Sequence, residues 1–293
     1  MDRLRGHMRG ADRLRLRDTI VTSEETKADT NLTKGIDADI EDLLISGLLR
    51  KLPKMIGVDS LAIFSEERGI SCLPEGSDPD QAAWVAFVDP VDGTEFVEHL
   101  QGGWCLLALY NRADNRVEVA VAGDAFLNRL YWASRSGPPE GLDFVTHSWF
   151  KLDGGPAPRK KVAGCRINIL TTKVDRFLAV SNQRRLLDKL ACEDGRINLA
   201  WGSNAIIQVA AGYADAAVEF CKGFAAYDLL PGLFIAEQAG LTVLDTTGRP
   251  LVSTVDVPEI FAAWRTDPKT PKRTKFVVAK EEELAHEIVS LLD

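Results

Sequence analysis

The chain has 293 residues, of which 45% are hydrophobic, 27% charged and 8% aromatic, the balance of a globular protein with a large buried core. This composition excludes a disordered chain, a collagen-like fibre and a small disulfide scaffold. Because 35 Lys and Arg stand against 43 Asp and Glu, the net charge is -8, and we expect no nucleic-acid polymer as a partner.

The first 18 residues are rich in arginine and lack the apolar core of a secretory signal, so they predict a solvated helix, with a transit peptide as the alternative. The five cysteines are odd in number and widely spaced, which is typical of free thiols in a reducing cytosol. The apolar runs are far shorter than the ~20 residues of a membrane helix. We therefore expect a cytoplasmic protein that does not bind membranes.

The first half of the sequence predicts one helix followed by a sheet. Residues 37–52 carry apolar side chains at helical spacing and are followed by Pro53. Residues 60–64 and 84–88 are apolar runs of strand length, and each ends in acidic residues. Further strands are predicted at 104–110, 116–122 and 129–133.

The second half predicts a mixed α/β lobe. Residues 137–166 are crowded with glycine, proline and basic residues, which indicates surface loops and a crossing between two lobes, residues 1–160 and 161–293. Predicted strands and helices alternate beyond that point. The strands are 168–171, 177–180 and 214–220, and the helices are 183–192, 202–211 and 228–239.

Acidic residues gather where the predicted elements end. The stretch Asp89-Pro90-Val91-Asp92-Gly93-Thr94 holds two carboxylates three residues apart, and a helix starting just after it would aim free N–H groups at a phosphate. Carboxylates beside such an anion need cations between them, and Mg²⁺ prefers these oxygens. A solvated turn is the alternative for this stretch alone. Glu66 at the end of one strand and Asp228 near the start of a helix favour a metal site.

Four stretches resemble motifs of the inositol monophosphatase-like superfamily, in the family's order. This superfamily contains magnesium-dependent, typically lithium-sensitive phosphatases, among them fructose-1,6-bisphosphatases and 3'-phosphonucleotide phosphatases. The resemblance implies a layered αβαβα sandwich of two lobes, classed as α+β or α/β, with two or three Mg²⁺ ions and a homodimer. The four stretches are Ser65–Glu67, Asp89–Thr94, Gly202–Ala216 and Tyr227–Gly240.

The resemblance also implies a role for each matching residue. One metal would be held by Glu66, Asp89 and the carbonyl of Val91, and a second by Asp89, Asp92 and Asp228. Thr94, with Glu66, would orient and help to deprotonate the attacking water, so that Glu66, Asp89 and Thr94 are the catalytic residues.

Other positions would serve the substrate or a third metal. The N–H groups of Gly93 and Thr94 would hold phosphate oxygens. Glu219 would contact substrate hydroxyls, unless it is merely a strand-end acid, and Arg184 would contact a second phosphate or a sugar. Support for a third metal is expected from Thr33, Asp37 and Glu67.

These features predict a Mg²⁺-dependent phosphomonoesterase that hydrolyses a small polyol, sugar or nucleoside phosphate by attack of a metal-activated water. A bisphosphate-specific phosphatase is the alternative within the superfamily. A non-catalytic protein that binds a phosphorylated ligand is the alternative outside it, and it would be expected to have an incomplete set of metal ligands. The four histidines are dispersed, and we expect them to be structural or surface residues.

Overall fold

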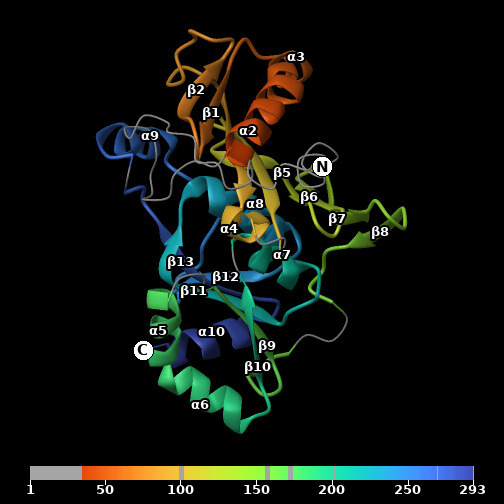
Figure 1. The fold of residues 1–293 in the computed structure, drawn as a ribbon, viewed down its shortest axis with the longest axis vertical. Helices are drawn as coiled ribbons and strands as arrows, with labels where there is room; N and C mark the ends of the chain where they lie inside the picture. Colours follow the sequence, from red (N-terminus) through yellow and green to blue (C-terminus); the bar gives the residue numbers. More distant parts are fainter. Residues whose placement is uncertain are drawn as a thin grey trace.

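The computed structural model describes residues 35–98, 102–155, 159–170, 174–200, 202–268 and 270–292. Within these ranges, two β-sheets alternate with three layers of helices, which gives a mixed α/β protein (Figure 1). The predictions for the arginine-rich start, Thr33, His7 and His99 lie outside the described residues.

The first sheet has eight strands in the order β2-β1-β3-β4-β5-β6-β7-β8. β1 and β3 run parallel and all the other pairs are antiparallel, so the carboxyl ends of β1 and β3 lie at the same edge. The strands are β1 (Leu61–Ser65), β2 (Gly69–Leu73), β3 (Trp84–Asp92), β4 (Trp104–Asn111), β5 (Arg116–Asp124), β6 (Arg129–Ser134), β7 (Gly137–Asp143) and β8 (Ser148–Lys151).

Both faces of this sheet are covered at β3, where successive side chains point to opposite sides. Val85 and Phe87 point into the core shared with the central helices α7 (Asn204–Ala210) and α8 (Ala226–Gln238). Ala86 and Val88 point to the opposite face, where they pack with Ile45 of the outer helix α2 (Gly35–Gly47). Burial on both faces explains why β3 is a continuous apolar run.

The second sheet has five strands in the order β10-β9-β11-β13-β12. One face packs on α7 and α8, and the other packs on α5, α6 and α10. The strands are β9 (Arg166–Leu170), β10 (Arg196–Ala200), β11 (Ala216–Phe224), β12 (Thr242–Asp245) and β13 (Thr274–Ala279), and the outer helices are α5 (Val174–Asn182), α6 (Arg184–Cys192) and α10 (Glu282–Leu291).

One helix of the second half returns to the first sheet. α9 (Val257–Thr266) follows β12 and lies beside β1 and β2 (Figure 1). The Trp264 ring meets the Phe64 ring edge to face, with centroids 5.1 Å apart. Arg265 forms an ion pair with Asp80 at 2.9 Å. α9 therefore packs the segment after β12 against β1, the strand that precedes Glu66.

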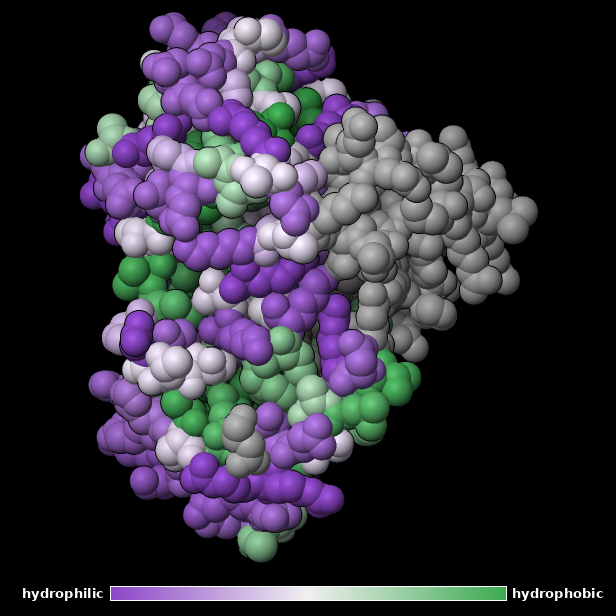
Figure 2. Space-filling model, turned by 90° about the vertical axis from the view of Figure 1, so that its left-hand side faces the viewer, coloured by the Kyte–Doolittle hydropathy of each residue, from purple (hydrophilic) through white to green (hydrophobic). Residues whose placement is uncertain are grey.

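The predicted strand at 177–180 is wrong, because these residues belong to helix α5. An apolar run this short fits a strand or one face of a helix, and periodicity alone does not separate them. In α5 only Val180 is buried, whereas Phe177 and Leu178 are exposed. On the side of the molecule that lies at the left of Figure 1, hydrophobic residues interrupt the hydrophilic surface in several places (Figure 2).

Two other predictions also need correction. Much of the predicted loop region 137–166 forms the strands β7 and β8, and its prolines fit because Pro138 and Pro139 lie opposite an irregularity in the β6–β7 ladder. The predicted helix 37–52 ends at Gly47, and the chain continues as the short turn η1 (Leu49–Lys51) and helix α3 (Leu52–Ile56).

The two sheets share one apolar core, which includes residues of β3, α8 and β11. The chain passes from the first sheet to the second between β8 and β9, and the division into lobes at residue 160 stays a prediction. All five cysteines are free, as predicted. Among the described residues, no helix has the length and apolar character that a membrane crossing requires.

Candidate metal centre

Glu66 and Asp89 are neighbours because β1 and β3 are parallel. Ser65 pairs with Val88 at the end of the ladder, and the N–H of Glu66 donates to the carbonyl of Val88 at 3.3 Å. Glu66 therefore leaves β1 beside the position where Asp89 stands on β3. The Asp89 side chain is only 2% exposed.

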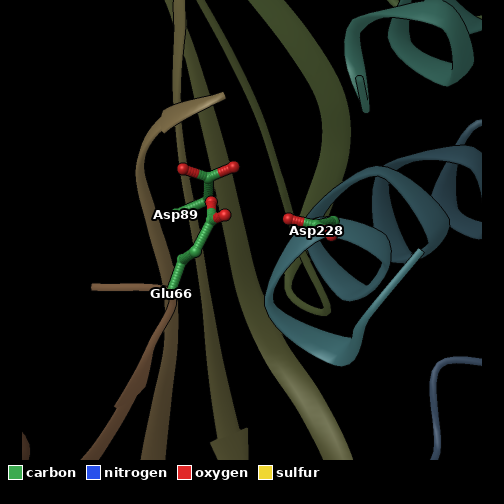
Figure 3. Close-up of side chains that lie close together, drawn as sticks. All are labelled: Glu66, Asp89 and Asp228. Carbon is green, nitrogen blue, oxygen red and sulfur yellow. The ribbon is translucent and has the colours of Figure 1, made fainter. Parts of the chain in front are cut away.

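Asp228 completes this group from the other side of the site. It lies in the first turn of α8, where the N–H of Ala225 donates to Asp228 Oδ2 at 3.2 Å. Glu66 and Asp89 lie side by side and Asp228 faces them from the helix (Figure 3). One carboxylate oxygen of each residue lies within 4.8 Å of the others, a spacing that a single cation can bridge.

The loop before α7 fixes Asp92, the last residue of β3. The N–H of Val91 donates to Asp89 Oδ1 at 3.0 Å, and the N–H of Ser203 donates to Asp92 Oδ2 at 2.7 Å. Ser203 also donates its hydroxyl to the main-chain oxygen of Asp228. Gly202 has a φ of +58°, and a Cβ on it would stand 1.9 Å from Asp92 Oδ2. Only glycine therefore lets this loop pass against the Asp92 carboxylate.

Thr94, the first residue of α4, contacts Asp37 on α2. Its hydroxyl lies 2.9 Å from Asp37 Oδ1 and 3.0 Å from the carbonyl oxygen of Val91, and both oxygens are acceptors. Asp37 is 2% exposed and Glu67 is 7% exposed, so both acids predicted to support a third metal are buried. Helix α4 (Thr94–Glu98) begins directly after Gly93.

Burial and the mutual repulsion of the carboxylates raise the pKa values of Asp89 and Asp92. Burial, followed by the charges of Glu66, Asp92, Asp228 and Asp37, holds the pKa of Asp89 well above its usual range. Burial and the nearby Asp228 raise the pKa of Asp92 to about 7, against the N–H of Ser203. A divalent cation would remove this repulsion, so the donor set fits a hard cation such as Mg²⁺.

Asp228 has a positive neighbour as well. Burial raises the pKa of its carboxyl, whereas Arg273 lowers it from a distance of 3.8 Å. Arg273 also donates to the carbonyl of Gly223 at 3.4 Å. Arg273 is not among the residues predicted from the sequence, because the basic stretch before β13 is typical of a solvated loop.

Two of the four predicted substrate contacts, Glu219 on β11 and Arg184 on α6, lie outside the β3–α4 segment that carries Gly93 and Thr94. Glu219 is 4% exposed, and its Oε1 accepts the N–H groups of Cys221 at 2.7 Å and Gly223 at 3.1 Å. It therefore braces the bulge in β11 that adds residues before Asp228. Arg184 is exposed on α6, at the end of the molecule remote from α4 and α8 (Figure 1). The structure does not bring Arg184 to the acids.

Comparisons with known proteins identify a family and a shared fold. The family model described as the inositol monophosphatase family matches residues 11–293. The comparison with curated proteins found no match.

Solved structures share the fold at low sequence identity. A Pyrococcus horikoshii protein described as having similarities for inositol-1 monophosphatase is 19% identical, with a TM-score of 0.64 over 91% of this chain and 89% of its own. The extragenic suppressor protein SuhB from Bartonella henselae is 16% identical, with a TM-score of 0.64 over 98% and 93%. A dual specific IMPase/NADP phosphatase bound with D-inositol-1-phosphate is 16% identical, with a TM-score of 0.62 over 89% and 84%.

The fold is that of a layered α/β protein, and it brings buried acids together at one site. The family match extends over nearly the whole chain. The chain belongs to the inositol monophosphatase family.

Proposed function

We propose that this protein is a Mg²⁺-dependent phosphomonoesterase that hydrolyses a small polyol, sugar or nucleoside phosphate. The observation that carries the proposal is the convergence of Glu66, Asp89 and Asp228, whose carboxylate oxygens lie within 4.8 Å of one another. Membership of a phosphatase family supports the reaction class.

The residues divide into two ligand sets. Glu66, Asp89 and the carbonyl of Val91 would hold one Mg²⁺, and Asp89, Asp92 and Asp228 would hold a second. When bound, Mg²⁺ lowers the pKa of water and offsets the charge of the phosphate. The raised pKa values of Asp89 and Asp92 support this assignment. A cation bound between the two carboxylates would stabilise their charged forms, which burial and repulsion otherwise disfavour.

Thr94 and Asp37 would direct the attacking water. The Thr94 hydroxyl reaches Asp37 at 2.9 Å, so its proton is taken by an acceptor and its lone pairs are available to a water molecule. A proton from that water can pass to the Thr94 oxygen as the Thr94 proton moves to Asp37. The N–H groups of Gly93 and Thr94, at the start of α4, would hold the phosphate oxygens.

The substrate is tested with a panel. Neighbouring structures are described as bound to D-inositol-1-phosphate and to 2'-AMP, and one is described as an NADP phosphatase, so these compounds join hexose and pentose phosphates and bisphosphates. The measurement is release of inorganic phosphate with and without Mg²⁺. A preference for bisphosphates would identify the alternative class within the superfamily.

Asp89→Asn tests the mechanism, because an amide holds a cation far more weakly than a carboxylate does. We expect phosphate release to fall at least about 100-fold, the scale of losing a metal ligand. Asp114→Asn is the matched control, because Asp114 is a half-exposed acid in the β4–β5 turn. Equal release by Asp89→Asn and the wild type, or release without a divalent cation, would overturn the proposal.

A further inference from the structure

A second acid of α2 lies one helical turn after Asp37. Residues four apart share a helix face, so Glu41 points to the same side as Asp37. The Glu41 side chain is 1% exposed, although it lies on a helix at the surface of the first sheet. The mechanism proposed above uses Asp37 and leaves Glu41 unexplained.

Glu41 contacts the turn that carries Glu66. Its Oε2 lies 2.9 Å from Arg68 Nε, and Arg68 also reaches Asp42 on the outer side of α2. The N–H of Arg68 donates to Ser65 Oγ at 3.2 Å within the same turn. The Arg68 side chain therefore contacts α2, and its main chain contacts Ser65 at the start of the turn that holds Glu66.

Packing alone does not account for an acid at this position. A buried carboxylate loses its hydration, and a hydrophobic side chain of similar volume is often as stable or more stable there. The Glu41–Arg68 pair differs from the Asp42–Arg68 pair in the exposure of its acid. The Glu41 side chain is 1% exposed, whereas the Asp42 side chain is 64% exposed. What the pair adds is a directed contact between α2 and the turn.

We infer that Glu41 and Arg68 are positioning residues for the metal centre, which lock the Ser65–Gly69 turn onto α2. This inference rests on the proposed function. α2 also holds Asp37, so the same contact fixes the spacing between the Thr94–Asp37 pair and Glu66. Residues that orient metal ligands in this way typically change metal affinity by about 10- to 100-fold when they are removed.

The test is binding of Mn²⁺, a spectroscopic substitute for Mg²⁺, measured by electron paramagnetic resonance on the full chain without substrate. We expect Glu41→Ala and Arg68→Ala each to weaken Mn²⁺ binding about tenfold. We expect the double variant to bind Mn²⁺ as tightly as the single variant of lower affinity, because the two residues act as one unit. Saturating Mg²⁺ should restore kcat in these variants.

Two further variants separate positioning from stability. Glu41→Gln retains an oxygen acceptor for Arg68 and should bind Mn²⁺ within about threefold of the wild type. Asp42→Asn removes only the exposed partner and should bind within about twofold. Near-ultraviolet circular dichroism reports whether each variant is folded. If Glu41→Ala does not fold, the comparison of Arg68→Ala with Asp42→Asn still decides the result.

Wild-type affinity in folded Arg68→Ala, or additive losses in the double variant, would overturn the inference. Absence of Mn²⁺ binding to the wild type would overturn it as well. Wild-type Mn²⁺ binding without release of phosphate from any substrate would instead overturn the proposed function alone, since the binding measurement involves no turnover.

Discussion

Gly202 shows how a single residue protects the site. Its φ of +58° favours glycine, and its Cα faces the Asp92 carboxylate so closely that no other side chain fits. Gly57 has a similar φ of +73°, but a Cβ there would meet open space. Substitution of Gly57 therefore tests backbone strain alone, whereas substitution of Gly202 adds a steric clash with Asp92.

We expect Gly202→Ala to abolish phosphate release, because the added methyl group must displace Asp92 or the loop before α7. Gly57→Ala should cost about 1 kcal/mol of stability and leave release unchanged. Phosphate release and urea unfolding of both variants check this. Full activity in Gly202→Ala would mean that Asp92 is not needed in its present position.

Glu41 also predicts a pH dependence of stability. Burial raises its pKa from 4.5 to about 7, outweighing the opposing effects of Ser65 and Arg68. Between these pH values the unfolded chain loses the proton while the folded protein keeps it. Stability from this group is therefore complete below pH 4.5 and is lost as the pH rises to about 7, by roughly 3 kcal/mol.

Glu41→Gln removes this titration. We expect the variant and the wild type to differ little in free energy of unfolding at pH 5, and the variant to be more stable by about 1–3 kcal/mol at pH 8. Urea unfolding in the presence of a chelator measures the difference without a metal contribution. A difference that is the same at both pH values would show that Glu41 does not titrate in this range.

At the residue scale, the sequence was sufficient for acids that end strands or begin helices. Glu66 and Asp89 follow apolar runs, and the parallel pairing of those runs brings them together. Glu41 could not be identified, because an acid on an amphipathic helix is typical of a solvated face. Its burial depends on the β1–β2 turn, which is a tertiary contact that periodicity does not encode.

At the element scale, α9 contributes an aromatic contact behind the acids. Trp264 is 7% exposed, and it packs against Phe64, two residues before Glu66. A Cβ on Gly69 would stand 2.5 Å from Trp264 Nε1, so the indole lies directly on the β1–β2 turn. α9 thereby supports the strand end that supplies Glu66.

We expect Trp264→Ala to lower the free energy of unfolding by about 3–5 kcal/mol, the usual cost of removing a buried aromatic side chain. Trp149→Ala is the control, because that side chain is 64% exposed, and its cost should stay below about 1 kcal/mol. Urea unfolding measures both. Equal losses would show that α9 is not an integral part of the core.

Elements were predictable where an apolar run was long and ended at turn or acidic residues, as for β3, β4 and α8. The prediction failed for α5, whose apolar run exposes Phe177 and Leu178 and buries only Val180. It failed again for β7, because two prolines normally interrupt a strand. The ladder irregularity that accommodates them is a property of β6 and β7 together.

At the scale of the whole molecule, the two sheets are joined by one core around α7 and α8. The sequence predicted two lobes from a change in composition, but composition does not reveal how far two lobes share a core. We expect a single cooperative thermal transition, with calorimetric and van't Hoff enthalpies that agree. Two resolved transitions would show that the sheets unfold independently.

The gathering of acids around Asp89 has a further consequence for folding itself. Carboxylates that are buried close together repel one another, so this site destabilises the folded state that the remaining contacts stabilise. Such a conflict is called local frustration. A divalent cation that binds only the folded chain relieves that conflict and adds stability in proportion to the logarithm of its concentration. The cation would then act as a folding ligand as well as a cofactor, so that its concentration would change both the fraction of folded protein and the activity proposed above.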